Sequence, residues 1–431
     1  MERKIFPITS ASACQLKWAW STVFFNSGTT ASCHRTQKYS IDPNNFDQFH
    51  NLPAKILARQ KMQSGIWPEG GCEYCKNTED AGGVSDRQSN LSVGNAALTP
   101  PELATDISAT SVTPTILEVY FKNTCNMACV YCGPHFSSLW EDENRRFKSN
   151  FAPKGLMFDD RAAQFNPDYD RMVADLWRYL EQDNRYRVLN RYNILGGEPF
   201  LMKELDDSIE FWRTHPNPDL IFSITTNLNI PTERFKRYIK QFEKLVLGNK
   251  IWKLQLTASL DCWGPEQEYV RYGLDLKQWE ANFELILNKP WISPGINSAV
   301  SSLTIKSMPA LLEKINYWNS NQTAVIKGRE RVRIAEPILH SFNTSGRQED
   351  PYNFGNYFDA DMLRILALMP NTTEDQQRQR LAMSGIAKRL SSTEPNMSTI
   401  TELKTYLDQL DQRRQTNWQT HFPWLKDDFN I

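Results

Sequence analysis

The chain has 431 residues, of which 40% are hydrophobic and 23% are charged, as in ordinary soluble globular proteins. Its formal net charge of −1 excludes a bulk electrostatic attraction to nucleic acid or to membranes. No apolar run approaches the roughly 18 residues that span a bilayer, and residues 1–7 lack the apolar core of a signal peptide. We expect a cytoplasmic protein without nucleic-acid or membrane partners, built as one large domain with additions or as two to three domains.

In a reducing compartment, the eight cysteines are better explained as metal ligands than as disulfides. Four lie near the N-terminus, three share one short loop and one stands alone. In chain order they are Cys14, Cys33, Cys72 and Cys75, then Cys125, Cys129 and Cys132, and last Cys262. This division suits one fully ligated cluster, one cluster with an open iron and a spare thiol.

The first 100 residues begin with a predicted hairpin and a predicted helix. Alternating residues at 18–25 and 30–33, on either side of Gly28, predict a β-hairpin. Residues 52–64 predict a short helix that ends at Gly65. Residues 85–113 are rich in Ser, Asn, Thr, Ala and Pro and are predicted to form a linker.

The same region contains a predicted metal site. Cys72 and Cys75 are separated by two residues and form a local knuckle, which Cys14 and Cys33 complete when the chain folds back. The residues alone leave both an iron–sulfur cluster and a zinc site open. Two other side chains are alternative ligands: His34 and His50.

Residues 114–340 alternate between strand-like apolar runs and helical patterns. Six runs are predicted as strands, at 116–121, 192–195, 220–226, 253–260, 297–303 and 332–336. Helical periodicity occupies 169–180, 205–214, 232–245, 279–287 and 308–318. Repeated β/α units predict a parallel sheet that binds its ligands at the carboxyl ends of the strands.

Three cysteines follow the first of these strands. Cys125, Cys129 and Cys132 have the spacing C-x3-C-x2-C on one short loop. Three thiolates on such a loop can bind three irons of a [4Fe–4S] cluster, because soft sulfur suits iron. The fourth iron then has no protein ligand, so a small molecule can bind to it and be reduced. Zinc binding is the alternative for this motif.

This spacing resembles that of the radical S-adenosylmethionine (SAM) enzymes. The resemblance implies that the amino and carboxylate groups of SAM bind the open iron of the [4Fe–4S] cluster. It implies that one electron then cleaves SAM to methionine and a 5′-deoxyadenosyl radical. It also implies an α/β fold, a partial (β/α)6 TIM-like barrel, for residues 114–340. Tyr131, the aromatic residue before the third cysteine, is expected near the adenine.

The end of the second strand carries a further motif of the same family. Gly196, Gly197 and Glu198 precede a proline and resemble the G-G-E-P motif that binds the amino group of SAM. Glycines allow the backbone to approach a ligand closely, and a carboxylate accepts hydrogen bonds from an ammonium group. We therefore expect these three residues to bind the cofactor.

The third and fourth strands end in weaker matches to the family. Thr225 and Asn227 lie in a segment that resembles the T-N-G motif, with Leu228 in place of the glycine. Ser259 begins an S-L-D segment and is expected to contact the ribose of SAM. Arg271 is expected to pair with the carboxylate of SAM.

The cysteine-rich N-terminal region resembles the auxiliary-cluster region of "twitch" or SPASM type in radical SAM maturases. The shared features are C-x18-C, a helix that ends in Gly and Trp, G-C-x2-C-x3-E and a later Ser-x-Arg. In most relatives this region follows the catalytic core, whereas here it precedes the core. The resemblance implies a second [4Fe–4S] cluster with four cysteine ligands, which is suited to electron transfer.

Cys262 lies just past the fourth strand, where relatives often have glycine. A thiol at this place can donate a hydrogen atom to a substrate radical, as a peptide epimerase requires. The alternative is that Cys262 is a small buried hydrophobic residue.

Residues 341–431 are predicted to form a helical extension. Helical patterns occupy 362–369, 372–389 and 400–418. We expect this extension to cap the open side of the barrel. The alternative is a surface for the substrate or for a partner protein.

These features predict a radical SAM enzyme that abstracts a hydrogen atom from its substrate. The resemblance to twitch and SPASM enzymes implies a ribosomally made peptide as substrate, with crosslinking, epimerisation or splicease-type backbone excision as the outcome. Two alternatives stay open: dehydrogenation or rearrangement of a small molecule such as a sugar or nucleotide, and a non-catalytic zinc-binding scaffold. A flavodoxin or ferredoxin as electron donor and a small peptide-recognition protein are the expected partners.

Overall fold

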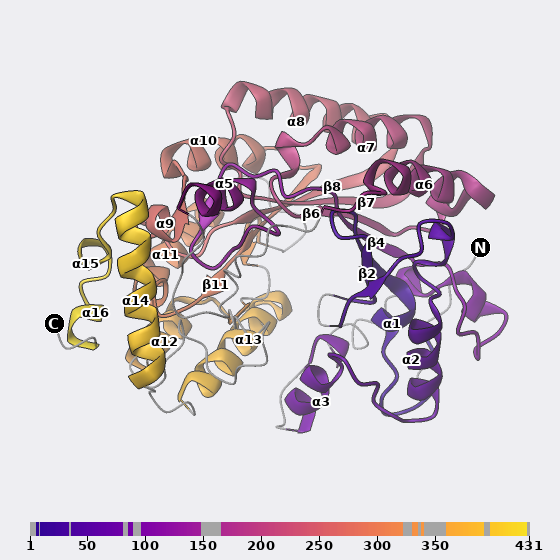
Figure 1. The fold of residues 1–431 in the computed structure, drawn as a ribbon, viewed down its shortest axis with the longest axis horizontal. Coiled ribbons are helices and arrows are strands. Elements are labelled where there is room, and N and C mark those ends of the chain that lie inside the picture. The colour runs from indigo at the N-terminus through magenta and orange to yellow at the C-terminus, as the bar shows by residue number, and fades with distance from the viewer. Residues whose placement is uncertain are drawn as a thin grey trace. The chain divides into compact units, whose positions relative to one another are not determined.

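The computed structural model describes residues 6, 7, 9–33, 36–80, 85–88, 96–147, 165–321, 330–334, 338, 339, 359–391 and 397–428. The chain divides into two compact units, which contain the elements labelled in Figure 1. The first unit comprises residues 1–122, 164–224 and 240–254, and the second comprises residues 123–163, 225–239 and 255–431. Strands β7 (Asn217–Thr226) and β8 (Ile251–Ser259) contribute residues to both units.

The described strands include a nine-stranded sheet with the order β12-β10-β8-β7-β6-β4-β1-β2-β3. The strands between β4 and β12 follow one another in chain order, as consecutive β/α units require. The pairs β4–β6, β6–β7 and β10–β12 are parallel. The bounds of the remaining strands of this series are β4 (Ile116–Tyr120), β6 (Arg191–Leu195), β10 (Ile292–Asn297) and β12 (Arg333–Ile334).

Helices separate these strands, which confirms the predicted α/β class and its large parallel sheet. They are α5 (Ser138–Phe147), α6 (Tyr169–Glu181), α7 (Lys203–Thr214), α8 (Thr232–Leu247), α9 (Pro265–Val270), α10 (Leu276–Leu287) and α11 (Met308–Ser320). In α6, Met172, Leu176 and Leu180 recur every fourth residue and are all buried, so one face of the helix packs into the core. Helices α6 and α7 lie along the same side of β6 and β7 in Figure 1. Closure of the sheet into a partial barrel stays a prediction.

The fifth predicted strand was misplaced. The sequence predicted residues 297–303, whereas β10 covers Ile292–Asn297 and pairs with β12 through Gly295 and Ile296. Pro294 and Gly295 explain the error, because both residues are normally depleted in strands. The short strand β11 (Ala299–Val300) follows and pairs with β13 (Ile338–Leu339). The sixth predicted strand is confirmed at residues 333–334, while residues 335 and 336 lie outside the described residues.

The N-terminal hairpin is confirmed, and it extends the main sheet. Strand β1 (Trp20–Phe24) pairs antiparallel with β2 (Thr29–Ala31), which in turn pairs with β3 (Tyr39–Ser40). Strand β1 also runs parallel to β4, from Trp20 opposite Ile116 to Phe24 opposite Tyr120. The predicted helix is α2 (Pro53–Gln63), and the segment predicted to be a linker buries Leu98, Leu103 and Val112.

The C-terminal helices are confirmed in the part of the chain that the structure describes. They are α12 (Asp359–Leu368), α13 (Glu374–Ser391), α14 (Met397–Arg414), α15 (Trp418–His421) and α16 (Leu425–Asp428). Residues 340–358, at the start of the predicted extension, lie outside the described residues. None of the helices described in either unit combines the length and the apolar character that crossing a membrane requires.

Candidate functional site

The three-cysteine loop lies in the second unit, where backbone pairing fixes it. Strand β5 (Ala128–Cys129) pairs with β9 (Arg271–Tyr272), so that Cys129 lies opposite Arg271. The indole N–H of Trp140, on α5, donates to the carbonyl oxygen of Cys129 at 2.8 Å. Cys129 is buried, whereas Cys125 and Cys132 are partly exposed. The loop therefore has a defined backbone and partial access to solvent.

Two N–H donors reach the sulfur atoms of this loop. The side-chain amide of Asn227 donates to Sγ of Cys125 at 3.7 Å, and Nη1 of Arg271 donates to Sγ of Cys129 at 3.9 Å. Burial raises the pKa of the Cys129 thiol, and the charge of Arg271 opposes this effect. Burial and the nearby Cys129 raise the pKa of Cys132 to about 12. Thiols in such surroundings become thiolates when a metal binds them, and donors to sulfur favour the bound form.

Arg271 has a partner that the sequence did not indicate. Its Nε and Nη2 atoms donate to the two oxygens of Asp261, each at 2.9 Å, and both side chains are buried. The hydroxyl of Tyr131 and the backbone N–H of Ala299 donate to the same carboxylate. Tyr131, predicted near the adenine, and Arg271, predicted on the SAM carboxylate, thus both bind Asp261.

The segment with the weak T-N-G match has the backbone that a glycine would provide. Leu228, which replaces the glycine, adopts a φ of 57°. The hydroxyl of Thr226 accepts from the N–H of Leu228 at 2.9 Å, and Asn282 donates to the carbonyl of Leu228 at 3.1 Å. These bonds offset the roughly 1–2 kcal/mol that a left-handed conformation costs a residue with a Cβ atom. Asn227 is therefore held where it reaches Cys125.

The other two polar residues predicted at strand ends lie where expected along the chain. Thr225 is the penultimate residue of β7 and is partly exposed, and Ser259 is the last residue of β8 and is buried. The contacts of both residues with a ligand stay predictions.

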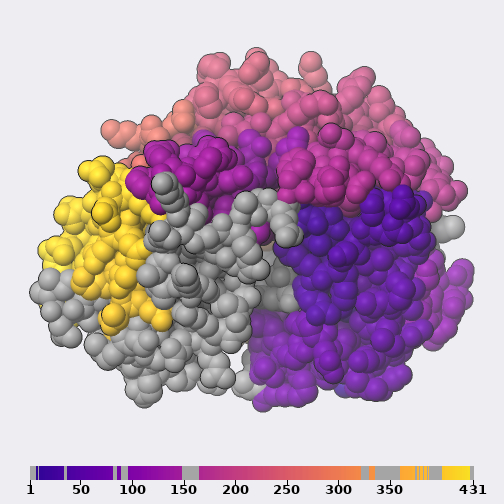
Figure 2. All heavy atoms as spheres, viewed as in Figure 1, coloured from indigo at the N-terminus to yellow at the C-terminus, as the bar shows by residue number. Residues whose placement is uncertain are grey.

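The C-terminal helix α14 supports the cysteine loop, which the sequence did not predict. The hydroxyl of Tyr406 donates to the carbonyl oxygen of Val130, between the second and third cysteines, at 2.8 Å. Nε of Arg414 donates to Glu143 on α5 at 3.0 Å, and its guanidinium lies 4.6 Å from the ring of Trp140. Figure 2 shows α14, in yellow, beside α5, in purple.

The Gly196-Gly197-Glu198 motif lies in the first unit. Gly196 and Gly197 have φ angles of 82° and 50°, directly after the carboxyl end of β6. Glu198 is completely buried, and one of its oxygens accepts from the N–H of Phe200 at 3.0 Å. Its carboxylate therefore caps a short 3-10 helix in addition to its predicted role at SAM.

Replacing Gly196 with alanine is expected to lower the free energy of unfolding by about 1–3 kcal/mol. A Cβ atom there would collide with the ring of Tyr120, which is stacked on Phe24 at 4.6 Å and has little room to move. Gly65→Ala is the matched control, because Gly65 has a similar φ of 79° but no neighbour within 4 Å of a Cβ atom. Denaturant unfolding measures both changes, and equal losses in the two variants would contradict the predicted collision.

Cys262 is completely buried, and its Sγ atom lies 3.5 Å from Oε1 of Gln267. We expect Cys262→Ala to lower the free energy of unfolding by about 1 kcal/mol, the usual cost of a small cavity, and to leave product formation unchanged. Denaturant unfolding and product analysis check these outcomes. Loss of product while SAM is still cleaved would establish the predicted hydrogen-donor role instead.

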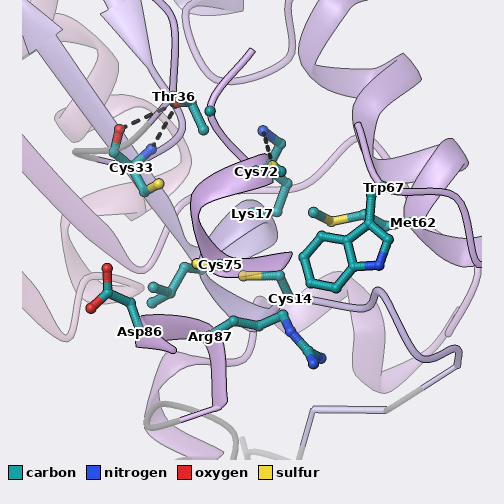
Figure 3. Close-up of a pocket in the computed structure, with 12 residues that line it drawn as sticks. Cys14, Lys17, Cys33, Thr36, Met62, Trp67, Cys72, Cys75, Asp86 and Arg87 are labelled. Atoms are coloured by element: carbon teal, nitrogen blue, oxygen red, sulfur yellow. Dashed lines mark hydrogen bonds between the residues drawn. The ribbon is translucent and has the colours of Figure 1, made fainter. Parts of the chain in front are cut away.

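The four N-terminal cysteines come together around one pocket of the first unit. Cys14 precedes α1 (Gln15–Ala19), Cys33 follows β2, Cys72 directly precedes α3 (Glu73–Asp80) and Cys75 lies in the first turn of α3. Figure 3 shows their side chains around the pocket, together with Lys17, Trp67 and Arg87. Burial and the nearby Cys33 raise the pKa of Cys14 to about 12, and burial also raises the pKa values of Cys72 and Cys75. Four soft donors around one partly exposed pocket suit a thiolate-bound metal centre.

The polar residues that follow Cys75 form a hydrogen-bond network beside this pocket. Nε of Arg87 donates to Glu79 at 2.9 Å, and its Nη1 atom donates to the carbonyl oxygen of Ala13 at 2.9 Å. The hydroxyl of Ser85 donates to the same carboxylate of Glu79. The C-x3-E and Ser-x-Arg elements of the sequence thus form one network beside Cys14.

The alternative histidine ligands gain no support. Nε2 of His50 lies 2.9 Å from the carbonyl oxygen of Trp18, and His50 is not among the residues that line the four-cysteine pocket. His34 lies outside the described residues. Within the described ranges, no group of three or more His, Cys, Asp or Glu side chains is close enough to share a single metal ion. The ligands of a [4Fe–4S] cluster each bind a different iron, so a cluster and a single ion require different sulfur spacings.

No protein-family model and no curated protein matches the sequence. Among solved structures, SuiB from Streptococcus suis is 13% identical over 86% of this chain and 69% of its own, with a TM-score of 0.37. SuiB bound to S-adenosylmethionine is 14% identical over 73% of this chain and 64% of its own, with a TM-score of 0.32. The structure of anSMEcpe with AdoMet and the Kp18Cys peptide is 15% identical over 58% of this chain and 57% of its own, with a TM-score of 0.34. Likeness at such low TM-scores fixes neither fold nor function.

Proposed function

We propose that this protein is a radical SAM enzyme whose Cys125, Cys129 and Cys132 bind a [4Fe–4S] cluster with one open iron. The proposal rests on the contacts that fix the backbone of the loop and reach its sulfur atoms. Backbone pairing and Trp140 fix Cys129, and N–H donors reach two of the three sulfur atoms. Donors to sulfur and restricted solvent access are the features by which proteins tune such clusters.

When bound, the cluster supplies the electron that cleaves SAM into methionine and a 5′-deoxyadenosyl radical. The chain's own residues bind and orient the co-substrate. Gly196, Gly197 and Glu198 are assigned to the amino group, and Thr225 and Ser259 to polar contacts with the rest of SAM. Asn227 is assigned to Cys125, whose sulfur its amide reaches.

The structure modifies our assignment of Arg271 and Tyr131. Because Nε and Nη2 of Arg271 are bonded to Asp261, we infer that this arginine positions the cysteine loop through its remaining nitrogen, which faces Cys129. Tyr131 donates to the same carboxylate, so its ring is held beside the guanidinium at 5.4 Å. A SAM carboxylate must therefore compete with Asp261 for Arg271.

We further propose that Cys14, Cys33, Cys72 and Cys75 bind a second [4Fe–4S] cluster that transfers electrons. Their convergence on one pocket supports four-cysteine ligation. The resemblance of this region to twitch and SPASM sequences supports a ribosomally made peptide as the substrate. A flavodoxin or ferredoxin is the proposed electron donor, and a small peptide-recognition protein is a proposed partner.

Anaerobic reconstitution followed by incubation with SAM and dithionite tests the proposal. We expect about eight irons per chain and the formation of 5′-deoxyadenosine. Cys129→Ala should lose about half of the iron and all SAM cleavage, whereas Cys75→Ala should lose iron but retain cleavage. Zinc in place of iron, or a fully loaded protein that leaves SAM intact, would refute the proposed function.

A further inference from the structure

Besides Arg87, which lines the four-cysteine pocket and pairs with Glu79, three further buried cations lie in the N-terminal region that forms the pocket. Lys17, Lys55 and Arg59 are 5%, 1% and 0% exposed. Arg59 donates to four neutral acceptors, which are the carbonyl oxygens of Lys17, His50 and Thr110 and the side chain of Asn51. Burying positive charge among neutral acceptors is costly, which calls for a source of negative charge.

The hydrogen bonds of Lys55 suit an ammonium group and oppose the effect of burial, which lowers the pKa of this residue. Its Nζ atom lies 3.1 Å from the carbonyl oxygen of Ala31 and 2.8 Å from that of Phe49, and both oxygens only accept. It also lies 2.7 Å from the hydroxyl of Thr30, whose own hydrogen is donated to the carbonyl oxygen of Thr22. Three N–H donors are needed, and only an ammonium group has three.

Lys17 connects these cations to the thiols. Its Nζ atom donates to Sγ of Cys72 at 3.7 Å, as the dashed line in Figure 3 shows. Nε of Arg59 donates to the carbonyl oxygen of the same lysine at 3.0 Å. Lys55 holds the carbonyl oxygen of Ala31, two residues before Cys33. The three cations are thus bonded to the segments that present Cys14, Cys33 and Cys72.

The hydrogen bonds of the neighbouring carboxylates go to groups other than these cations. The charge of Glu102 acts on Arg59, but its Oε1 atom accepts from the N–H and the hydroxyl of Thr113. The charge of Glu73 acts on Lys17, but its carboxylate is bonded to the N–H groups of Gly70 and Gly71 and is exposed to solvent. A third carboxylate, Asp86, lines the pocket and acts on Cys75. The hydrogen bonds of Lys17, Lys55 and Arg59 given above all end on sulfur or on neutral acceptors, so none of the three cations is bonded to a carboxylate there.

We propose that Lys17, Lys55 and Arg59 are the built-in counter-charge of the four-cysteine site, and that Lys17 raises the reduction potential of a cluster bound there. The inference rests on the proposed second [4Fe–4S] cluster. Such a cluster with four thiolates carries two negative charges when oxidised and three when reduced. Buried cations stabilise the reduced form more, because the attraction grows with the added electron. Reduction adds one electron and changes no bond.

A redox titration of the full-length chain tests this inference. Cys125→Ala, Cys129→Ala and Cys132→Ala are combined so that only the four-cysteine cluster remains, and dithionite titration is followed by electron paramagnetic resonance. In this background we expect Lys17→Met to lower the reduced-to-oxidised ratio at a fixed potential at least tenfold, which corresponds to about 59 mV for one electron. Lys17→Arg should keep most of the potential, because it keeps the charge and a donor.

Lys76→Met is the matched control. Lys76 is adjacent to Cys75, but its side chain is 44% exposed and pairs with Asp80, so solvent screens its charge. We expect its removal to leave the potential unchanged. Lys55→Met is a second variant. It removes a cation that is not bonded to a thiol, so we expect it to lower the reduction potential by less than Lys17→Met does.

The outcomes separate the inference from the proposed function. Equal potentials for the parent, Lys17→Met and Lys76→Met would overturn the inference and leave the cluster in place. A background protein that binds no iron–sulfur cluster would overturn both the inference and the second cluster. A Lys17→Met protein that folds, by circular dichroism, but loses its cluster while Lys76→Met keeps it would support the counter-charge role.

Discussion

Replacing Asp261 with alanine is expected to lower the free energy of unfolding by about 3–5 kcal/mol, the cost of leaving a buried charge without its partner. Asp261 is 0% exposed and accepts two hydrogen bonds from Arg271. It also accepts from Tyr131 and Ala299, so alanine would leave four donors unsatisfied. Urea unfolding of the cluster-free protein measures this loss, because it excludes any contribution from metal binding.

Asp142→Ala is the control for this change. Asp142 and its partner Arg145 are 55% and 71% exposed, so their removal should cost less than about 1 kcal/mol. Asp261→Asn keeps the shape but not the charge and should fall between the two. A loss below about 1 kcal/mol in Asp261→Ala would show that Arg271 finds another partner. After reconstitution, Asp261→Ala should also bind less iron at the three-cysteine loop, because Arg271 then no longer has a fixed position.

Arg414→Ala is expected to lower the free energy of unfolding by about 3 kcal/mol and to weaken cluster binding at the loop. Its guanidinium lies between Trp140 and Tyr272, at 4.6 Å and 4.5 Å from their rings, and pairs with the buried Glu143. Trp140 holds Cys129, and Tyr272 pairs with Ala128, so both rings belong to the support of the loop. Arg413 lies 3.8 Å from Glu143 and limits the loss.

The test compares iron content at the two cysteine sites. Arg414→Ala should lose iron from the three-cysteine loop and keep it in the four-cysteine pocket. Arg145→Ala, on the same helix α5 but 71% exposed, should keep iron at both sites. Unchanged iron and unchanged unfolding in Arg414→Ala would show that α14 covers the loop without supporting it.

Periodicity in the sequence was sufficient to locate most elements of the fold. Helices such as α6 and α8 have strongly one-sided apolar patterns, and the strands before the Gly196 turn and the cysteine loop are mostly apolar, with Asn193 and Glu118 as interruptions. The prediction missed strand β10, because Pro294 and Gly295 are normally depleted in strands. Pairing with the neighbouring strand β12 forms β10 nonetheless. The parallel pairing of β1 with β4 could not be predicted, since pairing across nearly a hundred residues leaves no local pattern.

The proposed ligand sets follow from the cysteine spacing and stay predictions, whereas the contacts that support the cysteines could not be predicted from the sequence. Cysteine spacing signals a metal site because the ligands must be close along the chain or brought together by a few turns. Asp261, Tyr406 and Lys17 give no such signal, since each contacts the site through a residue distant in sequence. Asp261 is the last residue of the S-L-D segment. Its position ten residues before Arg271 was the one feature of the sequence that suggested an ion pair between them.

The contact between Tyr406 and Val130 joins residues 276 positions apart. During translation, the cysteine loop is therefore synthesised long before the helix that contacts it. While ribosomes are still elongating the chain, the cysteine loop is already exposed but lacks its support from α14. The four N-terminal cysteines instead lie within the first 122 residues, in a segment that is synthesised early. If the two sites bind clusters as proposed, the ligands of the N-terminal pocket are all synthesised before the loop gains its support from α14, which requires synthesis to pass residue 414.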